Sequence, residues 1–139
     1  MKTSLMIAGL LLTTSMASAH EHMKHEMPNP KAKAYIVSPA NGATVSSPVT
    51  IQFGLDGMEV APAGTGHANS GHHHLIVDGE LPALDQPMGN QVKHFGKGQT
   101  ETTLELSPGQ HTLQLIMGDK MHTPHATPII SEKITITVK

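Results

Sequence analysis

The 139-residue chain contains no cysteine, no tryptophan and no arginine, and it has only two phenylalanines and one tyrosine. Without cysteine, both disulfide bonds and thiolate metal sites are excluded. Nucleic-acid binding requires cationic grooves and aromatic stacking platforms. Nine lysines against eleven acidic residues, with a net charge of −2, do not supply them. Sugar binding by aromatic stacking is disfavoured for the same reason.

Long hydrophobic runs are also missing, except at the amino terminus. Residues 1–19 carry a positive charge at Lys2, an apolar stretch over Leu5–Leu12 and the small residues Ala17, Ser18 and Ala19. This pattern is typical of a signal peptide that is cleaved after Ala19. No later apolar run approaches twenty residues, so we expect a mature chain that does not span a membrane and is located in the periplasm.

Histidine and methionine are abundant instead. The eleven histidines all follow the predicted signal peptide, and six of the nine methionines lie beyond Met16. Imidazole and thioether groups without thiols are the ligand set of copper handling in oxidising compartments. The alternative interpretation is that methionine fills the core and histidine is tolerated at the surface.

The segment 20–33, HEHMKHEMPNPKAK, is polar, contains two prolines and shows no periodicity, which predicts a flexible tail. Cleavage after Ala19 would place His20 first and His22 third in the mature chain. The free amine, two deprotonated amides and the His22 imidazole could then form a square-planar site for Cu²⁺ or Ni²⁺. Met23 and His25 add further donor atoms to this tail.

Alternating apolar and polar residues begin at Tyr35 and indicate β-strands, and no segment shows a helical stripe. We therefore expect an all-β domain over residues 34–139, an immunoglobulin-like β-sandwich of six to seven strands. The predicted strands cover residues 35–37, 49–55, 72–78, 100–106, 111–117 and 130–138, with a short edge strand near 91–95.

In an immunoglobulin-like topology, most histidine-bearing segments meet at one pole of the sandwich. His72 and His74 share one face of a strand, and the loop that carries His122 and His125 follows the neighbouring strand. His73 and His111 are in phase with apolar residues and should be buried. The candidate metal ligands are His20, His22, His25, His72, His74, Asp119, His122 and His125, with His67, His94, Met23 and Met121 as weaker candidates.

A hydrogen-bonded polar rim that only positions loops would use the same histidines without any metal, and this alternative stays open. The expected ion is copper, with zinc and nickel as other ions that imidazole accepts. The partners would be the metal ion and a periplasmic metal-transport or envelope protein.

Several segments resemble an uncharacterised family of exported bacterial domains of unknown function. They are SPANGATVSSPVTIQFGL, GHHHLIVDGELPALDQP, HFGKGQTETTLELSPGQHTLQLIMGD and the HTPH and ISEKITITV motifs that follow. The resemblance spans Val37–Lys139 and implies a small periplasmic β-domain, but no activity.

The opening SPANGATVSSPVTIQF is also similar to CopC-type periplasmic copper-resistance proteins over the first two predicted strands. That similarity implies a β-sandwich that binds Cu²⁺ through a histidine at the mature amino terminus. His20 is the residue with a counterpart there, although it lies well upstream of Tyr35, so the rest of that ligand set is not carried over.

Three classes of function follow from these features. The leading hypothesis is a periplasmic metal-binding protein, acting as a copper buffer or chaperone. The alternative is a non-enzymatic interaction or accessory module of the cell envelope, with a structural or pH-sensitive histidine rim. We do not expect an enzyme, because no catalytic arrangement of residues is identifiable in the sequence.

Overall fold

The computed structural model describes residues 31–139, which form two β-sheets and no helix. One sheet has three strands in the order β1-β3-β7, and the other has six, with β2-β9-β8-β5-β4 in order and β6 paired to β5. The strands are β1 Lys33–Ser38, β2 Thr44–Val45, β3 Val49–Asp56, β4 Glu59–Val60, β5 Ser70–Val77, β6 Lys93–His94, β7 Glu101–Leu104, β8 Gly109–Gly118 and β9 Ile134–Val138.

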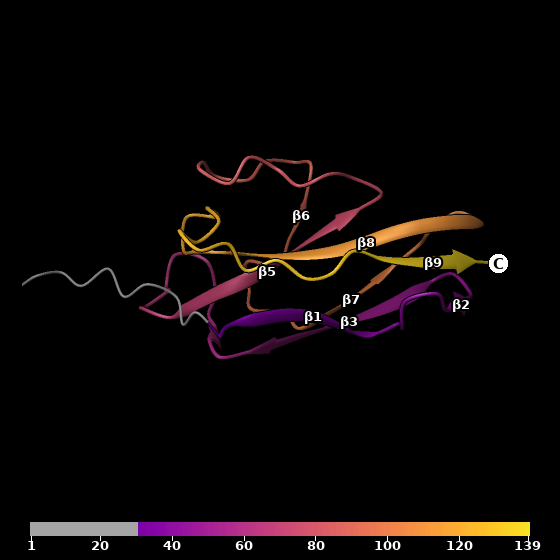
Figure 1. Cartoon of the computed structure of the whole chain (residues 1–139), viewed down its shortest axis with the longest axis horizontal. Coiled ribbons are helices and arrows are strands. Elements are labelled where there is room, and N and C mark those ends of the chain that lie inside the picture. The colour runs from indigo at the N-terminus through magenta and orange to yellow at the C-terminus, as the bar shows by residue number, and fades with distance from the viewer. Residues whose placement is uncertain (1–30) are drawn as a thin grey trace, which may run out of the picture.

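The two sheets lie on one another as layers (Figure 1). β1, β3 and β7 form the lower layer in this view, β5, β8 and β9 the upper one, and the segment that carries β6 runs outside the upper layer. Strands β5 and β8 pair antiparallel, with His72 opposite Gly118 and His74 opposite Ile116. The start of β5 therefore adjoins the end of β8 and the loop that follows it.

The main core lies between the two sheets and arises from the alternation of the strands. In β3, Val49, Ile51 and Phe53 are buried, whereas Thr50 and Gln52 between them are exposed. β8 and β9 contribute fully buried side chains from the other sheet, among them Leu113, Leu115 and Ile136. Burial of such side chains is worth about 1.5–3 kcal/mol each and is the main stabilising contribution to the domain.

A second, smaller core covers the outer face of the six-stranded sheet. It consists of Ile76, Met88, Val92 and Ile116, with Ile130 packed against it. Because side chains alternate along β5, His72 and His74 project on the same outer face as Ile76. The segments that follow β5 and β8 therefore bury these two imidazoles.

His73 projects to the other side of β5, into the main core, as its phase predicts. Its ring lies 5.1 Å from that of Phe53, which in turn packs against Phe95 at 4.9 Å. The side chain is 1% exposed, and neither ring nitrogen has a hydrogen-bond partner within the described residues. Burial lowers the pKa of His73, so this imidazole is neutral at neutral pH.

His111 is also buried, and it is fixed by polar contacts. Its Nδ1 lies 2.6 Å from Oδ2 of Asp78, and its Nε2 lies 2.7 Å from the carbonyl oxygen of Ser107. The hydrogen bonds to Asp78 and Ser107 raise the pKa of His111. The Asp78 carboxylate also accepts a hydrogen bond from the backbone N–H of Thr112, so the pair joins the end of β5 to β8.

The predicted strands are all present, but their bounds differ. The first strand is longer than predicted, beginning at Lys33. The last starts at Ile134, because Ile130 forms only an isolated bridge to Ile116 and residues 131–133 have no regular secondary structure. Strands β2 and β4 were not predicted. Both have two residues and pair parallel to their neighbours, so they are too short to leave a periodic pattern.

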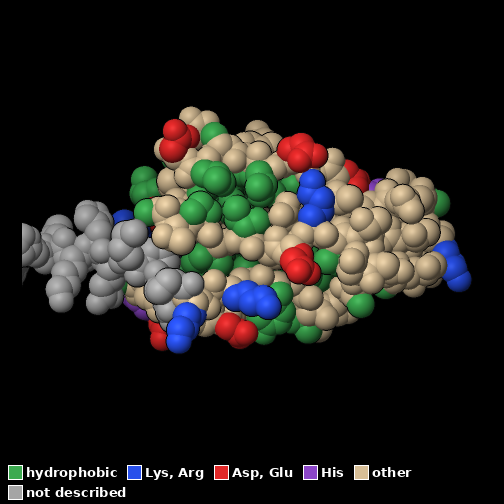
Figure 2. Space-filling view, viewed as in Figure 1, with side chains coloured by type: hydrophobic (Ala, Val, Ile, Leu, Met, Phe, Trp, Pro, Cys, Tyr) green, Lys and Arg blue, Asp and Glu red, His purple; other side chains and the backbone are tan. Residues whose placement is uncertain are grey.

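Charged groups of both signs are distributed over the surface. Figure 2 shows lysine and acidic side chains interspersed on one face, around a group of hydrophobic side chains. Among the described residues, Val37, Leu81, Leu84 and Met121 are large hydrophobic side chains that remain exposed. No helix within residues 31–139 has the length and hydrophobicity needed to cross a membrane.

Candidate metal centre

Four imidazole rings meet at the outer face of the six-stranded sheet, around Nδ1 of His122. Nε2 of His72 lies 2.9 Å from this atom, and Nε2 of His74 and Nδ1 of His94 each lie 3.2 Å from it. The rings of neighbouring pairs are 4.5–5.5 Å apart between centroids. One nitrogen each from His72, His74 and His122 lies within 4.8 Å of the other two, which would allow a metal ion to bind between them.

The sheet register brings three of these rings together. His72 and His74 are two residues apart on β5, so they point the same way. His94 lies on β6, directly opposite His74 in the antiparallel β5–β6 pair. His122 comes from the loop after β8, whose last residue, Gly118, is opposite His72.

The Asp119 side chain organises the loop that presents His122. Its Oδ1 accepts hydrogen bonds from the backbone N–H groups of Met121 and Thr123, at 2.8 and 3.0 Å. The backbone N–H of His122 donates to the Asp119 carbonyl oxygen at 2.9 Å, and that of Met88 donates to the His122 carbonyl oxygen. His122 adopts a φ of +60°, in the left-handed region that L-residues seldom occupy. Such strain is often found at functional sites.

Gly118 leaves the room that His74 needs. A Cβ at this position would lie 2.5 Å from Cε1 of His74 and 3.0 Å from Cε of Met88. Both side chains are buried and cannot move aside without disturbing the smaller core. The absence of a side chain at position 118 therefore permits the close approach of β8 to the imidazole.

Protons alone cannot satisfy the contacts of the cluster. A neutral imidazole has one N–H and one lone pair, so Nδ1 of His122 can form one good hydrogen bond among its three nitrogen neighbours. The facing nitrogens Nε2 of His72, Nε2 of His74 and Nδ1 of His94 therefore cannot all be satisfied by this one atom. A cation at the centre would instead use the converging lone pairs at once. The other nitrogen of each ring, Nδ1 in His72 and His74, would then carry the proton.

Burial keeps the imidazoles of β5 in the form that binds metal. Burial, followed by repulsion from the neighbouring imidazoles, lowers the pKa of His72 to about 4 and that of His74 to about 3. The Asp119 carboxylate opposes this effect in part at His72. Both rings are therefore neutral at neutral pH, and imidazole binds metal ions in its neutral form.

Comparison with known proteins identifies the family of the domain that carries this cluster. The family model described as a domain of unknown function, DUF4399, matches residues 51–139. The chain belongs to the DUF4399 family. The resemblance to an uncharacterised domain family is thereby confirmed, with a match that starts within β3. No curated protein and no solved structure matches the chain.

All four clustered histidines lie within the DUF4399 match, as do the candidate ligands that the structure places elsewhere. His125 is close by, but its Nε2 lies 3.0 Å from the carbonyl oxygen of Ser70. The Asp119 carboxylate organises the loop as described above, and Met121 is 62% exposed. The structure does not bring His125, Asp119 or Met121 into the cluster: Nε2 of His125 and Oδ1 of Asp119 contact backbone groups, and the Met121 side chain faces solvent.

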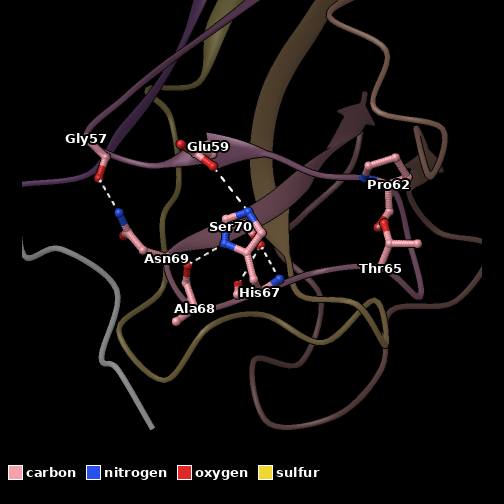
Figure 3. A network of polar contacts seen from close by, with 8 residues as sticks. All are labelled: Gly57, Glu59, Pro62, Thr65, His67, Ala68, Asn69 and Ser70. Carbon is pink, nitrogen blue, oxygen red and sulfur yellow. Dashed lines mark hydrogen bonds and ion pairs between the residues drawn. The ribbon is translucent and has the colours of Figure 1, made fainter. Parts of the chain in front are cut away.

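His67 belongs to a separate polar network in the DUF4399 domain, at the connection between β4 and β5 (Figure 3). Its Nε2 lies 3.1 Å from the carboxylate of Glu59, and its Nδ1 lies 2.8 Å from the carbonyl oxygen of Ala68. The Ser70 hydroxyl accepts from the His67 backbone N–H. His67 therefore helps to shape this connection and lies outside the cluster.

The tail candidates of this DUF4399 protein, His20, His22, Met23 and His25, lie outside the described residues. Sequence reasoning ranked His94 below the ligands that it favoured, because the segment before β7 showed little periodicity. The signal that could have found it is the predicted edge strand near residues 91–95. Pairing of that strand with β5 places His94 opposite His74.

Proposed function

We propose that this DUF4399 protein is an exported metal-binding protein that acts as a periplasmic copper buffer or chaperone. In this proposal His72, His74 and His122 hold the ion in the domain, and the amino-terminal tail supplies a second Cu²⁺ site. The role is binding rather than catalysis. The delivery partner would be another envelope protein with metal-binding groups of its own.

One observation carries the proposal: imidazole nitrogens converge on Nδ1 of His122 at 2.9–3.2 Å, and two of the rings, those of His72 and His74, are buried. Metal–nitrogen bonds of about 2.0–2.1 Å place neighbouring ligand nitrogens about 3 Å apart, in the observed range. A loop-positioning role would instead direct the rings toward backbone groups. Nε2 of His72 and Nε2 of His74 contact another imidazole.

The choice of copper rests on the donor set and on the predicted compartment. Imidazole suits copper, zinc and nickel, so the cluster by itself permits all three. The tail adds the amine, His20 and His22, an arrangement that suits Cu²⁺ and Ni²⁺. The predicted signal peptide over residues 1–19 would deliver the chain to a compartment where proteins handle copper without free thiols.

We also infer an immunoglobulin-like arrangement of the strands. β1, β3 and β7 would correspond to strands A, B and E, and β5, β8 and β9 to strands C, F and G. In this correspondence the start of strand C carries His72 and His74, and the F–G loop carries His122. The fold is compatible with many functions, so it does not itself favour metal binding.

Titration of the untagged protein with Cu⁺, Cu²⁺ and Zn²⁺, followed by calorimetry, tests the proposal. We expect each ion to bind the cluster at one equivalent, with a dissociation constant below about 1 µM, and Cu²⁺ to fill a second site in the tail. His22→Ala should remove the tail site and leave the cluster intact. Weak binding that never saturates would contradict the proposal and favour the envelope interaction module.

A further inference from the structure

We propose that His94 is the fourth ligand of the cluster and completes a tetrahedral four-imidazole site that suits Cu⁺ or Zn²⁺ better than Cu²⁺. This inference rests on the proposed function, since it concerns the same site. It adds a ligand beyond the His72, His74 and His122 group and specifies the coordination geometry.

The hydrogen bond of His94 to the backbone directs its free lone pair into the cluster. Nε2 of His94 lies 2.8 Å from the carbonyl oxygen of Gly89, which can only accept a hydrogen bond, so Nε2 carries the proton. Nδ1 of the neutral ring then has the lone pair, and it lies 3.2 Å from Nδ1 of His122. Metal-binding histidines commonly donate their other N–H to a backbone carbonyl or carboxylate in this way.

The distances around Nδ1 of His122 favour a tetrahedron over a square. In a regular tetrahedral site with bonds of about 2.05 Å, each nitrogen lies about 3.3 Å from all three others. In a square-planar site, each nitrogen has two neighbours at about 2.9 Å and one opposite at about 4.1 Å. The observed distances from Nδ1 of His122 to its three neighbours, 2.9, 3.2 and 3.2 Å, are nearly equal, and none approaches 4 Å. Among the described residues, only His72, His74 and His122 have nitrogens that all lie within 4.8 Å of one another, so an ion would have to draw His94 toward β5 to complete the tetrahedron.

The ring orientations agree with four ligands around one point. The His94 ring meets the His74 ring at 80° and the His122 ring at 76°, with centroids 4.8 and 4.9 Å apart. These edge-on arrangements keep the rings from stacking face to face and leave their nitrogens free to point inward. The ring orientations are therefore compatible with four imidazole ligands around one ion, with His94 on the solvent side.

A tetrahedral site has a consequence for metal choice. Zn²⁺ binds nitrogen ligands tetrahedrally, and Cu⁺ has the same filled d shell and hence no preference for a planar site. Cu²⁺ prefers square-planar or tetragonal nitrogen sites. A tetrahedral ion would be bound by His94, whereas a tetragonal Cu²⁺ site does not need a ligand at this position. Loss of His94 should therefore reduce the affinity for Zn²⁺ and Cu⁺ more than the affinity for Cu²⁺.

The test compares His94→Ala with Lys93→Ala, its neighbour on the same two-residue strand. Both side chains are exposed, so truncation of either leaves the core intact. We expect His94→Ala to weaken Zn²⁺ binding about 100-fold and Cu²⁺ binding less than about 10-fold. Lys93→Ala should change neither affinity. Co²⁺ serves as a spectroscopic probe, because its visible absorption is intense in tetrahedral sites and weak when water raises the coordination number.

The outcomes separate this inference from the function on which it rests. Tetrahedral Co²⁺ absorption in the wild type that weakens in His94→Ala would support the fourth ligand. Unchanged Zn²⁺ affinity and Co²⁺ absorption in His94→Ala, with normal wild-type binding, would overturn the role of His94 while leaving the metal site in place. A wild-type domain whose cluster binds none of Zn²⁺, Co²⁺, Cu⁺ and Cu²⁺ would overturn the proposed function itself.

Discussion

Replacement of His122 by alanine is expected to lower the affinity of the domain for Zn²⁺ by about 100-fold or more. Nδ1 of His122 contacts every other imidazole of the cluster, so its loss removes the central ligand. The binding free energy of a four-ligand structural zinc site is about 10–16 kcal/mol, or about 3 kcal/mol for each ligand. Loss of one ligand therefore corresponds to roughly two orders of magnitude in affinity. Competition with a chelator of known affinity measures the change.

His125→Ala is the matched control for this experiment. His125 lies on the same loop, and its Nε2 contacts the carbonyl oxygen of Ser70 rather than the cluster. We expect this variant to bind Zn²⁺ with nearly wild-type affinity. Equal loss of affinity in the two variants would show that the loop as a whole, and not the His122 imidazole, is required.

The second large effect is acid destabilisation of the metal-free protein. Burial lowers the pKa of His72 to about 4 and of His74 to about 3, and it also lowers the pKa of His73. In the unfolded chain these three imidazoles become protonated near pH 6.5, whereas in the folded chain they stay neutral at that pH. The free energy of unfolding should therefore decrease as the pH falls from about 6.5 toward 4, by up to about 1.4 kcal/mol per pH unit for each group.

Urea unfolding at a series of pH values, with a chelator present, measures this decrease. His111 acts in the opposite sense, because the hydrogen bond to Asp78 raises its pKa. Its contribution to the free energy of unfolding is complete below about pH 6.5 and is lost as the pH rises above that value. His73→Leu fills the same core position without a titrating group and should reduce the acid dependence, by at most about 1.4 kcal/mol per pH unit. A decrease that is equally steep in His73→Leu would contradict the assignment of a neutral, buried His73.

Much of the fold was predictable because alternation and turn residues mark the strands directly. The phase of β5 separated His73, which faces Phe53 in the main core, from His72 and His74 on the outer face. Antiparallel pairing of β5 and β8 then predicted that the loop carrying His122 lies close to them. These inferences need only strand periodicity and the order of neighbours.

The parts that could not be predicted depend on tertiary contacts. His125 and His122 are three residues apart on one loop, and only the hydrogen bonds around Asp119 decide which of them faces the cluster. An edge strand near residues 91–95 was predicted, but its pairing with β5, which positions His94, involves only two residues on each strand and could not be inferred from the sequence. The sequence likewise could not show that Glu59 pairs with His67, because the two meet through the irregular connection between β4 and β5.

The most direct test of the central claim is a long-range ¹H–¹⁵N correlation spectrum of the untagged protein, recorded with and without Zn²⁺. The spectrum identifies which ring nitrogens bind the ion. We expect large ¹⁵N shifts at Nε2 of His72, Nε2 of His74 and Nδ1 of His122, with His67 and His111 unchanged. Shifts confined to other histidines, with these three nitrogens unaffected, would contradict a metal site at the cluster.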